Sequence, residues 1–150
     1  MLTKATKFAR RYYRYYSAKF AMETLVFFVT NRCNFRCEHC FSMEAFENDK
    51  RKELSLEEIH KISSKIGYMP GLLLSGGEPV VRKDLPEICE TFYKGNGLEY
   101  IHLPTNAFYP QKVYATVQGI LEKCPGVDLG LGISLDGLQE THDKVRINPR

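Results

Sequence analysis

Short apolar runs alternate with longer amphipathic segments over most of the chain. Four of these runs carry the mixture of leucine, β-branched and aromatic residues that is typical of buried strands. We predict strands over 24–30, 72–75, 98–103 and 127–134. Each run ends in a polar loop, so the chain passes repeatedly from a buried segment to an exposed one.

Between the strands, the spacing of apolar residues and the capping residues predict three helices. Ser55 begins the first, because Glu58 three residues later completes a capping box, and Gly67 is its predicted end. Asp84 is the predicted cap of the second, with Glu87 at the matching position and the Gly-Asn-Gly at 95–97 as its end. The third covers about 111–123 and stops before Pro125.

The order β-α-β-α-β-α-β predicts an α/β fold with a parallel sheet and right-handed crossovers. A chain of 150 residues is too short for a complete eight-unit barrel, which takes about 250 residues. In parallel α/β proteins the loops after the carboxyl ends of the strands carry the chemistry. We therefore expect the polar motifs to gather at that end.

Residues 1–22 differ from the rest of the chain, and we divide the protein into this leader and a main domain over 23–150. A helix is predicted over 3–20, in which Phe8, Tyr12, Tyr16 and Phe20 recur every four residues. Our preferred interpretation is that this aromatic stripe packs on the main domain. A helix that binds a membrane surface or a partner is one alternative, and contact with nucleic acid through tyrosines and arginines is another.

Charge is concentrated in the leader, which carries six basic residues and no acidic one. The remaining 15 basic and 18 acidic residues leave the main domain slightly negative, so it does not have the composition of a nucleic-acid binder. No apolar run is long enough to cross a membrane, and no apolar stretch follows the N-terminal charges as in a secretory signal. We expect a reducing, cytoplasmic setting.

Three of the five cysteines, Cys33, Cys37 and Cys40, crowd into eight residues directly after the first predicted strand. Such crowding favours metal binding over disulfides. Three thiolates can hold an iron–sulfur cubane and leave one iron open to a small molecule, while Arg32 and Arg36 offset its negative charge. The alternative is a structural zinc site made of the three cysteines and His39.

The C-x3-C-x2-C loop resembles the cluster-binding loop of radical S-adenosylmethionine (radical SAM) enzymes, with His39 at the position of an aromatic residue. The resemblance extends over about 25–146. It implies a partial TIM-like (β/α) barrel and a [4Fe–4S] cluster on Cys33, Cys37 and Cys40. It also implies that SAM chelates the fourth iron through its amino and carboxylate groups.

Motifs after the second and third strands strengthen this resemblance. Gly76, Gly77, Glu78 and Pro79 are similar to the family motif that holds the SAM amino group, and two glycines let a backbone approach a ligand closely. Thr105 and Asn106 are expected near the cofactor. Related enzymes often read Thr-Asn-Gly here, and this chain has Ala107 in place of the glycine. The alternative at this position is a simple strand-exit turn with Asn106 in a left-handed conformation.

The stretch after the fourth strand, Ser-Leu-Asp-Gly followed by His142, Asp143 and Arg146, resembles that of peptide-modifying, SPASM-type enzymes and of molybdenum-cofactor-biosynthesis enzymes within the family. By this resemblance Ser134 lies near SAM and Asp136 contacts ligand or substrate. His142 and Asp143 order the loop or touch ligand, and Arg146 is the best candidate to pair with a carboxylate. The substrate is expected to be a peptide or a cofactor precursor.

The resemblance implies an enzyme in which the reduced cluster cleaves SAM to a 5′-deoxyadenosyl radical that abstracts hydrogen from a substrate. Ferredoxin or flavodoxin is the expected electron donor. Cys89 and Cys124 are expected to be unliganded, with Cys89 in the core beside Leu85, Ile88 and Phe92. The family core has six β/α units, and four strands are predicted here, so an inactive truncated fragment is a third interpretation besides the enzyme and the zinc module.

Overall fold

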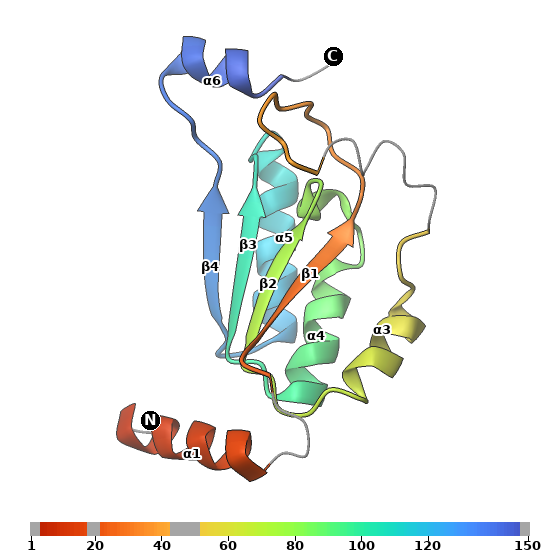
Figure 1. Cartoon of the computed structure of the whole chain (residues 1–150), viewed down its shortest axis with the longest axis vertical. Helices are drawn as coiled ribbons and strands as arrows, with labels where there is room; N and C mark the ends of the chain where they lie inside the picture. The colour runs from red at the N-terminus through yellow and green to blue at the C-terminus, as the bar shows by residue number, and fades with distance from the viewer. Residues whose placement is uncertain (1–3, 18–21, 43–51, 148–150) are drawn as a thin grey trace.

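Four parallel strands form one sheet whose spatial order, β1-β2-β3-β4, is also the order along the chain (Figure 1). The computed structural model describes residues 4–17, 22–42 and 52–147. Within it, the strands have the following bounds: β1 Thr24–Thr30, β2 Gly71–Gly76, β3 Tyr100–Thr105 and β4 Asp128–Ile133. The predicted α/β fold with a parallel sheet is therefore confirmed.

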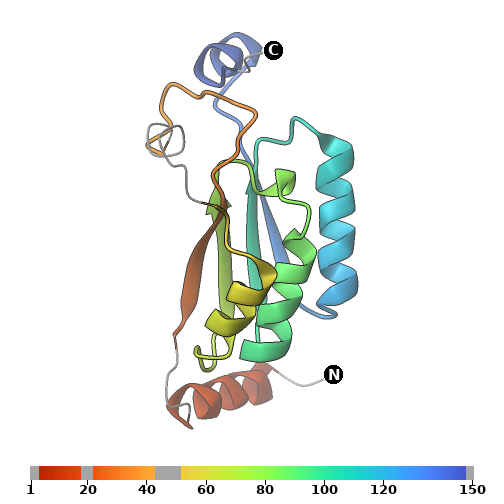
Figure 2. The ribbon, with the colours of Figure 1, turned by 90° about the vertical axis from the view of Figure 1, so that its right-hand side faces the viewer.

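The helices lie in three places around this sheet. Three of them, α3, α4 and α5, cover one face, while α1 lies beneath the amino ends of the strands and α6 above the carboxyl ends (Figures 1 and 2). Their bounds, with the short 3₁₀ helix η1, are α1 Lys4–Ser17, α3 Leu56–Ser63, η1 Pro79–Val81, α4 Leu85–Asn96, α5 Pro110–Lys123 and α6 Gln139–Val145.

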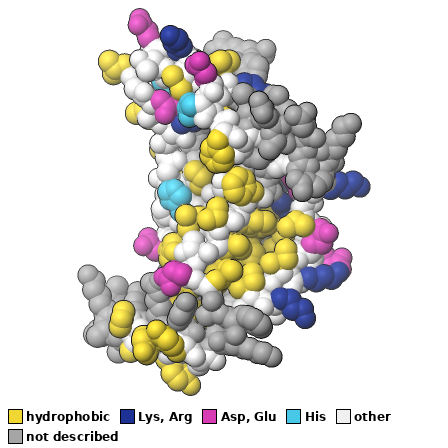
Figure 3. Space-filling view, viewed as in Figure 1, with side chains coloured by type: hydrophobic (Ala, Val, Ile, Leu, Met, Phe, Trp, Pro, Cys, Tyr) yellow, Lys and Arg dark blue, Asp and Glu magenta, His cyan; other side chains and the backbone are white. Residues whose placement is uncertain are grey.

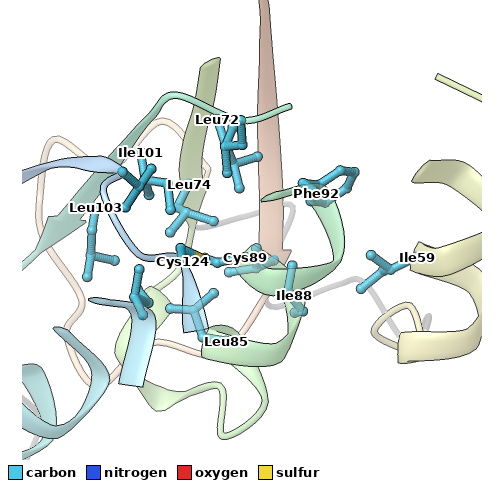
Figure 4. Close-up of a cluster of buried hydrophobic side chains, with 14 of the residues drawn as sticks. Ile59, Leu72, Leu74, Leu85, Ile88, Cys89, Phe92, Ile101, Leu103 and Cys124 are labelled. Atoms are coloured by element: carbon cyan, nitrogen blue, oxygen red, sulfur yellow. The ribbon is translucent and has the colours of Figure 1, made fainter. Parts of the chain in front are cut away.

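The core fills the space between the sheet and the three covering helices (Figure 4). Leu72 and Leu74 of β2 and Ile101 and Leu103 of β3 alternate with residues on the other face, as the period of two in a strand requires. They meet the inner faces of α4 and α5. Ile59, Leu85, Ile88, Phe92 and Ile120 contribute the helix side, each at most 1% exposed.

The opposite face of the sheet has no covering layer among the described residues. Val26 and Phe28 of β1 are 55% and 46% exposed there, and Figure 3 shows apolar side chains gathered over this face. One covered face and one open face, with β1 and β4 at the edges, make up a partial barrel rather than a two-sided layered sheet.

Two helix ends differ from their predictions. The capping box at Ser55 and Glu58 is present, but α3 ends at Ser63 and not at Gly67. The reason is a contact from far along the chain: the Asn96 side chain donates to the carbonyls of Ser63, Ile66 and Gly67 and so takes the place of hydrogen bonds that a further helical turn would make. Asp84 precedes α4 but makes no cap hydrogen bond, because its carboxylate pairs with Arg82.

The helix predicted in the leader forms, over Lys4–Ser17; positions 3 and 20 lie outside the described residues. The expected packing of its aromatic stripe is wrong. Phe8, Tyr12 and Tyr16 are 70%, 58% and 69% exposed, whereas the Arg14 guanidinium reaches the domain and lies 5.8 Å from the centre of the Tyr68 ring. The boundary proposed between residues 22 and 23 falls between α1 and β1.

Candidate functional site

The carboxyl ends of the strands surround a cavity of about 520 Å³. Its walls come from the loops after all four strands and from the segment after α6, the arrangement expected of a parallel sheet. The residues that line it are Asn31, Arg32, Cys33, Phe35, Arg36, Cys37, His39, Cys40, Phe41, Ser75, Gly76, Gly77, Glu78, Pro79, Pro104, Thr105, Asn106, Ser134 and Arg146.

Backbone hydrogen bonds hold the cysteine loop from two sides. On one side the Glu78 N–H donates to the Arg32 carbonyl over 2.9 Å. On the other, Arg36 N–H donates to the Ile147 carbonyl over 2.6 Å, and Glu38 N–H to that of Val145 over 3.0 Å. The chain around Cys37 is thus bound to a segment more than a hundred residues away, which the sequence does not indicate.

Gly76 and Gly77 are required by the approach of this loop. A Cβ at Gly77 would lie 2.2 Å from the Arg32 carbonyl oxygen, and one at Gly76 would lie 2.3 Å from that of Thr30. Gly76 also has φ at +129°, a conformation that L side chains rarely adopt. We expected these glycines to admit a ligand. In the structure Gly76 admits the end of β1 and Gly77 the start of the cysteine loop, and both glycines line the cavity as well.

The three thiols of the loop all line the cavity and are partly exposed. Burial raises the pKa of Cys33, although a hydrogen bond from the Phe35 N–H over 3.4 Å opposes that rise. Burial likewise raises the pKa of Cys37, and the positive charge of Arg146 offsets only part of that rise. In the free protein, a soft metal must therefore displace protons from these thiols when it binds.

Glu78 and Asn106 connect the loops that follow β2 and β3. The Glu78 side chain is 2% exposed and accepts a hydrogen bond from the Asn106 N–H over 2.7 Å. Burial raises the pKa of Glu78, against the opposing effect of that bond and others. Asn106 in turn donates through its side chain to Asn34 Oδ1 over 2.9 Å, so a single chain of contacts joins three loops.

The turn after β3 places Ala107, not Asn106, in the left-handed region, with φ at 55°. The alternative prediction of a left-handed Asn106 is wrong by one residue. Thr105 contributes to this turn, because its hydroxyl accepts a hydrogen bond from the Ala107 N–H over 3.0 Å. The departure from the Thr-Asn-Gly pattern thus falls on the residue whose backbone favours glycine.

After β4, the structure separates the predicted residues. Ser134 and Arg146 line the cavity, and Asp136 does not. The Asp136 carboxylate is instead bound by the Arg146 side chain, which lowers the pKa of Asp136. Arg146 was predicted to pair with a carboxylate, and within the described residues its partner is Asp136.

Three thiols around one cavity are a donor set that an iron–sulfur cubane can use. Across residues 4–17, 22–42 and 52–147, no three His, Cys, Asp or Glu side chains are arranged to hold one metal ion. A cubane requires instead one thiolate on each of several irons, and three thiols around one cavity meet that demand. Buried near them, Asn34 Nδ2 has no hydrogen-bond partner among the described residues.

Comparison with known proteins decides the family. The model of the radical SAM superfamily matches residues 27–149. The chain belongs to the radical SAM superfamily. Members of this family use a [4Fe–4S] cluster and SAM, so the resemblance drawn from the cysteine loop is confirmed.

Radical SAM relatives of known activity are much longer than this chain. It is 35% identical over 125 residues to Fe-coproporphyrin III synthase of Methanosarcina barkeri and 32% identical over 128 residues to GTP 3′,8-cyclase of Staphylococcus aureus. These matches cover 81% and 75% of this chain but 29% and 34% of the relatives. The chain thus spans about a third of their length.

The fold agrees with a solved radical SAM structure, that of histidine-tagged anSMEcpe with bound AdoMet. The TM-score is 0.63 at 21% identity, over 86% of this chain and 36% of that one. Among the described residues, no helix is long and apolar enough to cross a membrane.

Cys89 and Cys124 lie in the core (Figure 4), and neither lines the cavity. Burial raises the pKa of both thiols, that of Cys124 to about 11, so both stay protonated at neutral pH. The cavity also has walls that the sequence did not single out, namely Asn31, Phe35, Phe41, Ser75 and Pro104. A signal for Ser75 was present, since it ends the strand that leads into Gly76.

Proposed function

We propose that this chain is the cluster- and SAM-binding part of a radical SAM enzyme, with Cys33, Cys37 and Cys40 as the cluster ligands. The observation that carries the proposal is the convergence of these three thiols on one cavity with the Gly76–Gly77–Glu78 loop. Together, the bound cluster and SAM supply a 5′-deoxyadenosyl radical. The protein's part is to position both and to keep water and competing reactions out.

Charges around the cavity support the cluster assignment. Arg36 and Arg146 line the same space as the thiols, and their positive charges lower the pKa of Cys33 and Cys37, respectively. Arg32 also lines the cavity, but its guanidinium pairs with Glu53. The Phe35 N–H is already aimed at Cys33 Sγ, and hydrogen bonds to cluster sulfurs raise reduction potentials and stabilise the reduced state. Membership of the radical SAM superfamily, whose members use a [4Fe–4S] cluster and SAM, favours the cluster over a zinc module.

We assign the SAM contacts to the part of the cavity wall that the residues at the ends of β2, β3 and β4 form. Glu78 has a buried carboxylate with a raised pKa, so the ammonium group of SAM would stabilise its ionised form. Gly76, Gly77 and Pro79 shape the surface beside it, and Thr105, Asn106 and Ser134 offer polar groups along the same wall. His39, an exposed residue that also lines the cavity, is a further candidate contact, whereas Asp136 would act through Arg146.

The substrate, the electron donor and the compartment stay predictions. A peptide or a cofactor precursor is the substrate class we favour, with ferredoxin or flavodoxin as reductant in a cytoplasmic setting. The chain spans about a third of the length of these relatives. We therefore assign it cluster and SAM binding and do not assign substrate turnover to these 150 residues alone.

Anaerobic reconstitution tests the proposal. We expect iron and sulfide in cubane ratio and a change in the electron paramagnetic resonance spectrum of the reduced protein when SAM is added. Glu78→Gln should weaken SAM binding by about 1.5–3 kcal/mol, the scale of a charge-assisted hydrogen bond. Colourless protein with one zinc would support the zinc module, and equal SAM affinity in wild type and Glu78→Gln would remove Glu78 from the site.

A further inference from the structure

Helix α1 exposes four aromatic rings on one half of its surface. Phe8, Tyr12, Tyr13 and Tyr16 are 70%, 58%, 73% and 69% exposed, and the helical repeat places all four on the same half. Figure 3 shows apolar side chains exposed on this helix at the end of the molecule. An aromatic surface of this kind in water requires a partner.

The other half of α1 carries the polar residues and faces the domain. The Arg14 guanidinium lies 5.8 Å from the centre of the Tyr68 ring. Arg14 and Ser17 line an open groove of about 1010 Å³ together with residues at the amino ends of the strands. The rings are therefore directed away from the sheet, and the contact with the domain does not cover them.

The positive charge of the leader indicates what kind of surface it binds. Residues 1–22 carry six positive charges and no negative one, while the rest of the chain has 15 basic and 18 acidic residues. The helical repeat puts the basic positions 4, 7, 10, 11 and 14 together on the half opposite the rings, with 4, 10 and 11 bordering them. The leader attracts an anionic surface, and the main domain does not.

We propose that α1 is an interfacial helix that docks the protein on an anionic lipid surface. In such a helix, aromatic rings enter the boundary between headgroups and acyl chains. Bordering lysines and arginines extend along their apolar stems to reach the headgroup phosphates. Single-stranded nucleic acid fits less well, because stacked bases need cationic groups interleaved with the rings, and the four exposed rings lie on the half of the helix that the basic positions 4, 7, 10, 11 and 14 do not occupy.

The position of α1 has a consequence for the cavity. The helix lies beneath the amino ends of the strands, and the cysteine loop lies at their carboxyl ends (Figures 1 and 2). A protein docked through α1 would hold the mouth of the cavity away from the lipid, where substrate and reductant arrive from water. The docking does not depend on the proposed cluster.

Co-sedimentation of the full chain with vesicles tests this. We expect binding to phosphatidylcholine vesicles that contain phosphatidylglycerol, little binding to pure phosphatidylcholine, and a decline with added salt. The triple variant F8A/Y12A/Y16A should lose affinity for the mixed vesicles at least about tenfold, since three rings no longer enter the interface. K4Q/K7Q/R10Q/R11Q should remove the preference for the anionic lipid.

The matched control is Y114A/L121A, which removes two exposed apolar side chains of α5, 64% and 47% exposed, and should bind vesicles as wild type does. Circular dichroism checks that each variant is folded. Equal binding to both kinds of vesicle, or unchanged binding by the triple variant, would overturn the proposal. So would tighter binding to a single-stranded RNA oligonucleotide than to vesicles, or a dimer that the triple variant abolishes without lipid.

Discussion

Two asparagines at opposite ends of the sheet have contrasting surroundings. At the amino end, Asn96 is 2% exposed and accepts from the Ser63 hydroxyl while its amide donates to the carbonyls of Ser63, Ile66 and Gly67. At the carboxyl end, Asn34 accepts one bond from Asn106, and its Nδ2 has no partner among the described residues. The polar atoms of the Asn96 side chain all have hydrogen-bond partners, whereas the Nδ2 atom of Asn34 has none among the described residues.

The same contrast holds for the charged and sulfur-bearing groups. Arg82, 4% exposed, binds the Val29 and Leu54 carbonyls and the Asp84 carboxylate. Cys33 and Cys37 are partly buried, and their raised pKa values show that their thiolates are poorly stabilised as the protein stands. Buried polar groups normally find partners. The Asn34 Nδ2 atom has none among the described residues, and the thiolates of Cys33 and Cys37 are poorly stabilised. We infer that these groups lie where a ligand binds.

The largest effect should come from the thiols. Replacing Cys33, Cys37 or Cys40 by alanine should abolish cluster uptake, because the loop then supplies two ligands in place of three. Iron content and visible absorbance after anaerobic reconstitution measure this. The free variants should stay folded, since none of these partly exposed side chains belongs to the core.

Cys89→Ala and Cys124→Ala are the matched controls. Both thiols lie in the core, so their removal should lower the melting temperature through a small cavity and leave the iron content per folded chain unchanged. A cluster that survives in Cys37→Ala, or disappears in Cys89→Ala, would contradict the assignment of the loop cysteines as the cluster ligands.

The second largest effect should come from Asn96. Asn96→Ala removes the side-chain donor to three backbone carbonyls, of which that of Ser63 keeps the Ile66 N–H as a donor. We expect a loss of about 2–4 kcal/mol in the free energy of unfolding. Urea denaturation of the free protein measures it. Ser63→Ala removes one of the same contacts and should cost about 1 kcal/mol.

Asn34→Ala completes the comparison at the other end of the sheet. It removes one accepted bond but also an amide group that has no partner among the described residues, so the free protein should change by less than about 1 kcal/mol. The variant should be affected in the loaded protein instead, as weaker SAM binding or a changed reduction potential. Equal destabilisation by Asn96→Ala and Asn34→Ala would mean that the missing hydrogen-bond partner of Asn34 does not distinguish it from a structural residue such as Asn96.

Glu78 sharpens the comparison through pH. Because burial raises its pKa, the folded free protein holds this proton more tightly than the unfolded chain. The resulting stability is complete below the ordinary pKa of glutamate and is lost as pH rises through the raised value. Glu53 and Asp84, with lowered pKa values, act in the opposite direction, so the test is the difference in unfolding free energy between wild type and Glu78→Gln at each pH. A difference that does not change with pH would show that Glu78 is not buried as a carboxyl group.

How far the sequence predicts these features depends on the distance between the residues involved. Two local patterns could be predicted from the sequence: the capping box of Ser55 and Glu58, and the spacing of Cys33, Cys37 and Cys40. The end of α3 is set by Asn96, and the contact of Asn34 with Asn106 joins residues 72 apart in the chain, so neither leaves a local pattern. Helix α6 was missed because none of its residues is buried, which leaves no apolar periodicity.

The smallest expected effect concerns a residue that the sequence did single out. Ala107 has φ at 55°, where an L residue is strained by about 1–2 kcal/mol, while glycine costs about 0.5–1 kcal/mol through the greater entropy of the unfolded chain. Ala107→Gly should therefore stabilise the free protein by about 0.5–1 kcal/mol. Denaturation midpoints measure this, with Ala115→Gly in the exposed surface of α5 as a control that should destabilise by about 1 kcal/mol. Because Ala107 adjoins the Asn106 contact with Glu78, an unchanged SAM affinity in the stabilised variant would show that the strain is tolerated rather than used. A loss of SAM affinity would show that the strained turn holds Asn106 in place for the cofactor.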